Sequence, residues 1–229
     1  MKYTTNFYKD ADNTFERYLE LERAKQVIKS YNKVGSGNVL DIGPGLLPYF
    51  LYIDNYDEYT IVEPEPEFVK TYPDSIIKIN STLEEFETDK KFDFIILSSV
   101  LHLVKDVDVF LTKLRGLCHD HTLVHINVPN SKSLHRLLGV EMGLLTSLDD
   151  KSEKDKIYNH QHNFNVEDLA YTLQVRNFRI KAYDTYMVKP FADSQMTRVI
   201  TREMAIGLDK LIKYLPKYGC EIAIEVKKS

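Results

Sequence analysis

The sequence predicts an α/β fold built on a mostly parallel sheet with helices on both faces. Short apolar runs alternate with amphipathic stretches along the 229 residues, as expected where strands alternate with helices. The runs FDFIIL and YTIV are apolar throughout, which is typical of strands buried on both faces. No internal repeat, low-complexity tract or Pro/Gly/Ser linker divides residues 1–229, so we expect a single domain.

Each predicted element has a local signal. Residues 14–33 carry apolar side chains at helical spacing and are followed by Gly35 and Gly37, which predicts a first helix. Apolar runs predict five strands, at Val39–Ile42, Tyr59–Val62, Ile76–Ile79, Phe92–Leu97 and Thr122–Val128, and two late strands near 178–186 and 220–226. Further helices are predicted at 45–53, 65–71, 105–117 and 165–175.

Two long stretches interrupt the alternation of strands and helices. They lie near 129–163, between a strand and a helix, and near 187–204, between the two late strands. Connections longer than about 15 residues in a compact domain are usually lids, binding loops or disordered segments. We therefore expect substrate contacts in these two insertions.

Composition narrows the class of protein. A net charge of −4 disfavours a nucleic-acid partner, because phosphate contacts need clustered Lys and Arg. The two cysteines, Cys118 and Cys220, fit a reducing cytoplasm better than a disulfide framework. The N-terminus has no signal-peptide pattern, and no apolar run reaches about 18 residues, so we expect a cytoplasmic protein without a membrane span.

The stretch VLDIGPGLLPYF places Asp41, Gly43 and Gly45 at the end of the first predicted strand. Glu63 ends the second strand, about twenty residues further on. Ligands of open parallel sheets bind at the carboxyl ends of the strands. Glycines let the main chain approach a ligand closely, and an acid at the end of the second strand suits a ribose diol. These residues therefore predict a nucleoside-containing cofactor.

Two cofactor classes use this arrangement. A dinucleotide requires G-x-G-x-x-G, but the third glycine is replaced here by Pro48. S-adenosylmethionine has no phosphate and carries positive charge, which suits a carboxylate at Asp41. The pattern therefore favours S-adenosylmethionine over NAD.

These motifs resemble those of class I S-adenosylmethionine-dependent methyltransferases. VLDIGPG is similar to their first motif and YTIVEPEPEFV to their second, and FDFIILSSVLHLVKDVDVFLTKL resembles their fourth strand and the next helix. The resemblance implies a Rossmann-like seven-stranded sheet in the order 3-2-1-4-5-7-6, with the last strand antiparallel. It also implies a helical cap over residues 1–34, in which Tyr3, Phe7 and Tyr8 fold over the cofactor. The alternative is that these aromatic residues belong to a frayed terminus or a hydrophobic staple. The cofactor-binding residues it implies are Asp41, Gly43, Gly45, Glu63, Pro64, Ser81, Thr82, Leu83, Ser98 and His102.

The acceptor is expected to be an oxygen of a small molecule. The chain has Ser98-Ser99-Val100-Leu101 after the fourth strand, where enzymes that methylate nucleobase or amide nitrogens often carry Asn/Asp-Pro-Pro-aromatic. VPNSKSLHRLLGVEMGLL, NHQHNF and KPFADSQM resemble a bacterial subgroup associated with surface-polysaccharide biosynthesis. This second resemblance implies a sugar or phosphorylated precursor of a capsule or surface polysaccharide, including one with a phosphoramidate group.

His135 and Arg136 are the predicted catalytic residues. A histidine can accept a hydroxyl proton near neutral pH, and an arginine can hold a carboxylate or phosphate in bidentate fashion. An acceptor that is already an anion needs no base, and Arg136 and Lys189 would then orient it. The alternative is that Arg136 pairs with a nearby acid and His135 caps a helix. The predicted substrate-binding residues are Asn130, Lys132, His160, His162 and Lys189.

Three further hypotheses remain open at this point. His102 is a second candidate base. His160 and His162 form an H-x-H pair, but no other ligands lie at metal-binding spacing, so no metal is predicted. An NAD(P)-dependent oxidoreductase is the first rival function. A catalytically inactive, methyltransferase-like binding subunit is the second rival.

Overall fold

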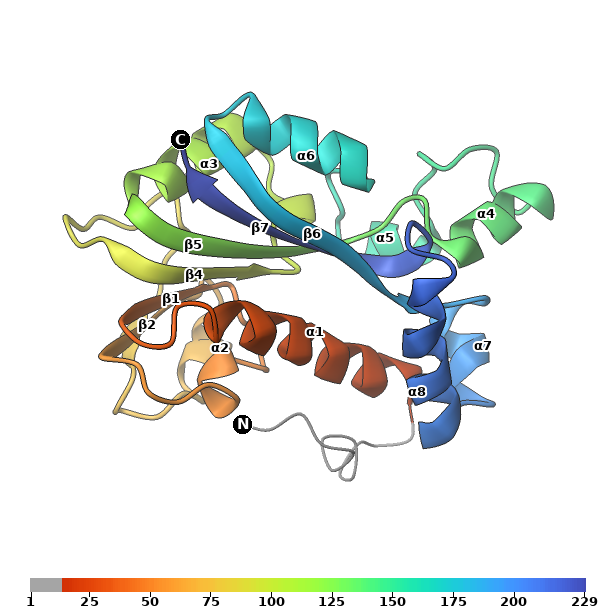
Figure 1. The fold of residues 1–229 in the computed structure, drawn as a ribbon, viewed down its shortest axis with the longest axis horizontal. Helices are drawn as coiled ribbons and strands as arrows, with labels where there is room; N and C mark the ends of the chain where they lie inside the picture. Colours follow the sequence, from red (N-terminus) through yellow and green to blue (C-terminus); the bar gives the residue numbers. More distant parts are fainter. Residues whose placement is uncertain (1–13) are drawn as a thin grey trace.

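The computed structural model describes residues 14–229 and contains one seven-stranded sheet (Figure 1). Its order, β3-β2-β1-β4-β5-β7-β6, is the predicted one. β7 is antiparallel to both of its neighbours and the other neighbouring strands are parallel, which confirms the predicted fold class. The strands are β1 Asn38–Ile42, β2 Glu58–Val62, β3 Ile77–Ile79, β4 Phe92–Ser98, β5 Cys118–Pro129, β6 Phe178–Val188 and β7 Gly219–Lys228.

Helices cover both faces of the sheet (Figure 1). α1 (Phe15–Tyr31) and the short α2 (Pro66–Val69) lie on one face, and α3 (Val107–Gly116) and α6 (Val166–Gln174) lie on the other. The Thr14 side chain accepts a hydrogen bond from Arg17 N and so caps the start of α1. Apolar side chains of α3 and α6 pack with β4, β5 and β7 in one core, while α1 packs with β1 and β2 in another.

The two insertions form small helices at the carboxyl end of the central strands (Figure 1). The first contains α4 (Leu134–Glu141) and α5 (Glu153–Ile157), and the second contains α7 (Asp193–Thr197) and the start of α8 (Arg202–Lys210). Residues of β6, β7, α7 and α8 pack against the first half of α1 in a third apolar cluster. The insertions therefore lie at the sheet edge where the sequence places the cofactor motif. Three short 3₁₀ helices complete the structure: η2 Tyr49–Leu51, η3 Leu101–Leu103 and η4 Leu211–Lys213.

The predicted helix at 45–53 is wrong. The chain there forms a loop followed only by η2. Pro48 lacks the N–H that a helix needs and disfavours helical backbone at the preceding residue, and Gly45 takes a left-handed φ of 59°. The apolar side chain of Leu46 is 67% exposed, so no buried face compensates for the two breakers.

Tyr3, Phe7 and Tyr8 lie outside the described residues, so the predicted cap is represented here by α1 and the loop that follows it. Over residues 14–229, no helix has both the length and the apolar character needed to cross a bilayer.

Candidate active site

Two glycines shape the turn that follows β1. Gly43 and Gly45 have φ values of 61° and 59°, in the left-handed region that other residues rarely adopt. A Cβ atom at Gly43 would also lie 2.9 Å from Cγ2 of Val100, which follows β4. The first glycine of the motif is thus required both by its backbone conformation and by the close approach of a neighbouring chain segment.

Asp41 is completely buried at the end of β1. Its Oδ2 accepts hydrogen bonds from Tyr49 N at 3.0 Å and from the Tyr59 hydroxyl at 2.7 Å. Its Oδ1 has no hydrogen-bond partner. Burial raises the pKa of this carboxyl to about 7, against the hydrogen bonds that lower it. The carboxyl group can therefore still accept a hydrogen bond from a positively charged group.

Glu63, at the end of β2, supports the glycine turn. Its Oε2 accepts from Gly45 N at 3.0 Å and its Oε1 accepts from Glu65 N at 2.9 Å. The Tyr72 hydroxyl donates to Gly45 O at 2.5 Å on the other side of the turn. Binding of a ribose diol by Glu63 would therefore compete with its bond to Gly45 N.

The remaining residues predicted near the adenosine follow β2 and β3 at the same edge. Pro64 is exposed, Ser81 and Thr82 are partly exposed, and Leu83 is buried in the core. The Asn80 side chain donates to the carbonyl oxygens of Glu63 and Pro64, at 3.0 Å each, and joins the two strand ends.

A cavity of about 150 Å³ opens between α1 and the glycine turn. Gly43, Tyr49, Ser98 and Ser99 line it, together with Arg23 of α1. The Tyr49 hydroxyl and Ser98 Oγ are hydrogen-bonded at 2.6 Å. Ser99 has a φ of 59°, and a non-glycine residue held in this conformation is strained, as is common at functional sites.

A larger cavity, of about 380 Å³, adjoins the first and shares Arg23 and Ser99 with it. Its walls come from α1, η3, both insertions and the start of β7. Six of the predicted site residues line it: His102, Asn130, His135, Arg136, His160 and Lys189.

Each cation in the larger cavity has a carboxylate partner. Arg23 pairs with Glu221 at 2.6 Å, Arg136 with Asp155 at 3.1 Å, and Lys189 with Asp193 at 2.6 Å. Arg136 also donates to the carbonyl oxygens of Leu148, at 2.9 Å, and Asp150. The three cations are therefore all held in ion pairs, Glu16 adds a fourth carboxylate to the lining, and Arg136 holds the first insertion in place.

Two histidines of the cavity are neutral at physiological pH. Burial, followed by the nearby Lys189, lowers the pKa of His135 to about 3, and its Nδ1 lies 3.0 Å from Ser133 Oγ. Burial and the neighbouring His160 lower the pKa of His102 to about 3, and its Nδ1 has no partner. Asp193 and Asp155 raise the pKa of His135, and Asp155 raises that of His102, but the effect of burial is larger in both cases.

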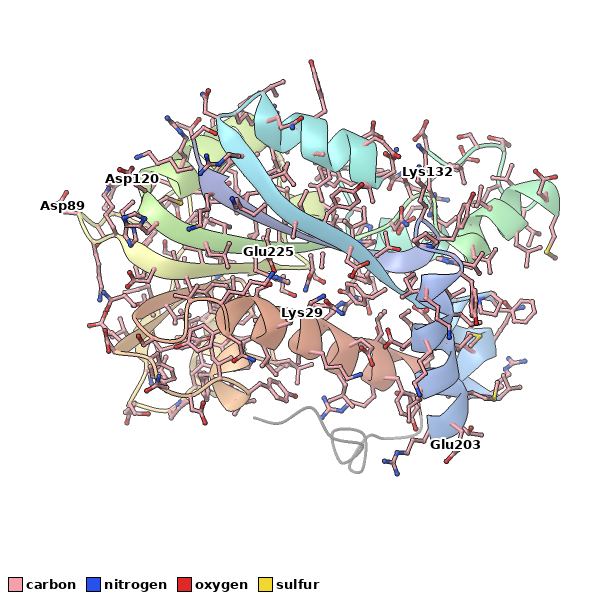
Figure 2. All side chains as sticks on the ribbon, viewed as in Figure 1. Lys29, Asp89, Asp120, Lys132, Glu203 and Glu225 are labelled. Carbon is pink, nitrogen blue, oxygen red and sulfur yellow. The ribbon has the colours of Figure 1, made fainter. Side chains whose placement is uncertain are left out.

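Three predicted substrate residues have other contacts. Lys132, labelled in Figure 2, pairs with Glu167 at 3.3 Å and lines neither cavity. The His162 ring bonds to Val104 O at 2.9 Å, also outside the cavities. The Asn130 amide donates to the carbonyl oxygens of residues 217 and 219 and so fixes the start of β7.

Several residues that line the cavities were not predicted from the sequence: Arg23, Ser99, Asp155 and Glu221. Only Ser99 carried a local signal, because it directly follows an apolar strand. The other three reach the site through helix and strand packing that no short motif encodes. In the part of the chain that the structure describes, no group of three His, Cys, Asp or Glu residues is placed to hold a metal ion.

Comparison with known proteins agrees with this geometry. A family model described as a methyltransferase domain matches residues 15–183. A search of curated proteins found no match.

Solved structures share the fold at low sequence identity. A methyltransferase dependent on S-adenosylmethionine from Thermotoga maritima is 13% identical, with a TM-score of 0.63 over 93% of this chain and 90% of that one. Another from Archaeoglobus fulgidus is 19% identical, with a TM-score of 0.58 over 91% and 94%. The 1,6-didemethyltoxoflavin-N1-methyltransferase of Burkholderia thailandensis, solved with 1,6-didemethyltoxoflavin and S-adenosylhomocysteine, is 16% identical, with a TM-score of 0.58 over 92% and 79%.

Proposed function

Since this chain belongs to the methyltransferase domain family, we propose that it transfers a methyl group from S-adenosylmethionine to a hydroxyl oxygen of a small polar molecule. S-adenosylmethionine supplies an electrophilic methyl group on a positively charged sulfur. The protein's main contribution is to hold the acceptor oxygen in line with that group and to exclude water.

The observation that carries the proposal is the convergence of unpartnered polar atoms on the two joined cavities. Buried polar atoms are normally hydrogen-bonded, so a cluster without partners marks a place where a ligand completes the bonding. Four such atoms belong to residues that line the cavities, and a fifth lies beside the glycine turn: Arg23 Nε, Ser99 Oγ, His102 Nδ1, Arg136 Nε and Asp41 Oδ1.

The smaller cavity fits the methionine end of S-adenosylmethionine. Asp41 offers a carboxylate oxygen without a partner near the turn, and the missing side chain at Gly43 leaves the main chain accessible. Glu63 would bind the ribose once its bond to Gly45 N is exchanged. Pro48 stands in place of the third glycine of the dinucleotide motif, which disfavours binding of NAD(P).

The larger cavity favours a neutral, hydroxylated acceptor. Its arginines and lysine are each paired with a carboxylate, so a phosphate or carboxylate acceptor would have to displace an internal ion pair. A hydroxyl compound can bond to the imidazole and serine groups without that displacement. Together with the sequence resemblance, this supports a sugar hydroxyl of a surface-polysaccharide precursor in the cytoplasm over a phosphoramidate.

Calorimetric titration with S-adenosylhomocysteine and with NADH tests the proposal. We expect micromolar binding of S-adenosylhomocysteine and none of NADH. Gly43→Ala should reduce that affinity at least about tenfold, because the added Cβ meets Val100 and the left-handed turn is strained. Gly143→Ala is the matched control, since Gly143 is also left-handed, at 70°, but has open space around its Cβ position and lines neither cavity.

Two results would contradict the proposal. Binding of NADH alone would assign the glycine turn to a pyrophosphate and support the oxidoreductase rival. Binding of neither S-adenosylhomocysteine nor NADH would support the rival hypothesis of an inactive binding subunit.

A further inference from the structure

We propose that His160, oriented by Asp155, is the general base that removes the proton from the acceptor hydroxyl. The inference rests on the proposed function and names a different base from His135, which the sequence favours. It follows from the contacts of both ring nitrogens, the backbone around His160 and the anchoring of Asp155.

The contact with Asp155 fixes the protonation pattern of the His160 ring. His160 Nδ1 lies 3.0 Å from Asp155 Oδ1, and the His160 side chain is only 11% exposed. A carboxylate accepts and does not donate, so Nδ1 carries the hydrogen of the neutral ring. Nε2 is then the proton acceptor, and His160 lines the larger cavity. No described residue forms a hydrogen bond with Nε2.

The backbone holds the ring in place from two sides. His160 N donates to Asp155 O at 2.8 Å. Gln161 N and His162 N donate to His102 O at 2.8 and 3.1 Å, which ties the segment to η3 directly after β4. His160 therefore lies in the wall of the larger cavity next to His102, which is on the short helix that follows Ser98 and Ser99.

Asp155 is itself anchored as a carboxylate. Its Oδ2 accepts from Arg136 at 3.1 Å and from Ser152 N at 2.7 Å. Burial alone would raise the pKa of Asp155, but the hydrogen bonds from His160 and Ser152 outweigh it and keep the pKa below its usual range. Asp155 therefore stays ionised and stabilises the imidazolium that forms when His160 takes a proton.

The other charged and titratable groups around His160 do not replace this pair. The His102 ring lies edge-on to the His160 ring, with centroids 4.3 Å apart, and His102 stays neutral. The larger cavity also holds Arg23, Arg136 and Lys189, each in its ion pair, and the neutral His135. His135 Nδ1 contacts Ser133 Oγ, whereas His160 Nδ1 contacts a carboxylate, and burial outweighs the influence of Asp193 and Asp155 on His135.

The proposed step balances without another reactant. The acceptor oxygen forms a bond to the methyl carbon, and the electron pair of the carbon–sulfur bond goes to sulfur. The hydroxyl proton moves to His160 Nε2, while the O–H electron pair stays on oxygen. His160 then releases the proton to solvent, and Asp155 keeps its charge throughout.

Imidazole nitrogen NMR on the ¹⁵N-labelled protein tests the pair without any acceptor. We expect His160 to carry its hydrogen on Nδ1 in the wild type, and Asp155→Asn to lose that preference, because the side-chain amide of Asn can donate to Nδ1. Asn keeps an oxygen for Arg136 and Ser152, so the insertion should stay folded. His160→Gln assigns the signal. A hydrogen on Nε2 in the wild type, or the same tautomer in the wild type and in Asp155→Asn, would overturn the inference.

Turnover measurements distinguish a catalytic role of His160 from a structural one. The probes are glycerol and methyl α-D-glucopyranoside, with S-adenosylhomocysteine formation as the readout. His160→Gln should lower kcat at least about 100-fold with little change in KM, and the exposed His121→Gln should match the wild type. A fully active His160→Gln overturns the inference, as does a loss confined to His135→Gln. If neither probe is methylated, the tautomer of the His160 ring still tests whether His160 can act as the base.

Titration with S-adenosylhomocysteine distinguishes a failure of the His160 inference from a failure of the proposed function. Binding together with a negative imidazole result rejects His160 alone. Loss of binding in the wild type rejects the proposed function, whatever the state of the imidazole.

Discussion

Asp41 places a carboxyl group in the protein interior with one oxygen unpartnered. Its pKa of about 7 means that the folded protein holds a proton that the unfolded chain releases near pH 4. The unfolded state therefore binds fewer protons between pH 4 and 7, and stability falls as pH rises through that window. A residue that is retained at this cost is expected to act in cofactor binding.

Asp41→Asn should separate the two effects. The amide keeps an oxygen for Tyr49 N and the Tyr59 hydroxyl, and it cannot ionise. We expect the gain in unfolding free energy over wild type to be about 2 to 3 kcal/mol larger at pH 8 than at pH 5. Affinity for S-adenosylmethionine should fall in the same variant. Urea unfolding at both pH values and calorimetry measure the two quantities.

The Asp41→Asn variant is therefore expected to be more stable than the wild type and to bind S-adenosylmethionine more weakly. An Asp41→Asn protein that is less stable than wild type at pH 8 would show that Asp41 is already ionised and satisfied in the folded state. Normal cofactor affinity would remove Asp41 from the cofactor site.

At the scale of elements, strands were easier to predict than the connections that carry the site. β1, β2 and β4 are apolar runs buried on both faces, and such runs have few alternative structures. The apolar letters at 45–53 also look helical, yet Pro48 and the left-handed Gly45 make a loop there. The backbone preferences of proline and glycine, and not the apolar periodicity, therefore determine the structure of residues 45–53.

The first insertion could be located but not folded from its sequence. Its position follows from the gap between β5 and α6, but its shape depends on Arg136, which bonds to the carbonyl oxygens of Leu148 and Asp150 and to Asp155. These contacts span residues 136–155 and leave no periodic signal. The open alternative that Arg136 pairs with an acid matches the geometry.

Arg136→Gln should loosen this insertion while the sheet stays folded. Each lost charge-assisted bond is worth about 1.5 kcal/mol or more, so tryptic cleavage after Lys151 and Lys156 should accelerate at least about tenfold. Arg176→Gln is a matched control, because it removes an arginine whose partners lie on α3 and α6. Mass spectrometry of timed digests measures the rates. Equal rates in wild type and Arg136→Gln would show that other contacts hold the insertion.

At the scale of the whole molecule, the two halves of the site differ in how far the sequence encodes them. The proposed cofactor side is local: Asp41 and Gly43 lie at the carboxyl end of β1 and Glu63 follows the adjacent β2, so a motif and a spacing predict it. The acceptor side joins α1, both insertions and β7, and the Arg23–Glu221 pair spans almost the entire chain. The antiparallel return of β7 brings Glu221 to Arg23, and ion pairs within the insertions join the other residues.

A buried polar chain also connects the smaller cavity, proposed for the cofactor, with the sheet-facing side of α1 near its C-terminal end. Ser98 contacts Asn127 at 2.9 Å, and Asn127 contacts His125 at 2.8 Å. Ser30 of α1 then bridges His125 and Glu225, at 2.7 Å each. Glu225 lies on the face of the sheet toward α1 (Figure 2). Because its members are buried, this chain couples the position of α1 to the wall of the cofactor cavity.

The chain should make stability sensitive to acid through His125. Burial lowers the pKa of His125 to about 4, against an ordinary value near 6.5. Between these values the unfolded state binds one more proton at this residue, so its contribution to stability is lost as pH falls from 6.5 toward 4. The buried Glu22, with a pKa raised to about 7, and Asp41 act in the opposite sense. A variant is therefore more informative than the wild-type curve alone.

His125→Gln should be less stable than wild type at pH 7, because it leaves Ser30 without one of its contacts. Its unfolding free energy should nevertheless lose about 1.4 kcal/mol less per pH unit between pH 6 and 4.5, since one linked proton is removed. His121→Gln, an exposed histidine on the same strand, should keep the wild-type slope. Urea unfolding at half-unit pH steps measures all three proteins. Parallel slopes for wild type and His125→Gln would mean that His125 titrates normally in the folded protein, and the buried chain would then be open to protons from solvent.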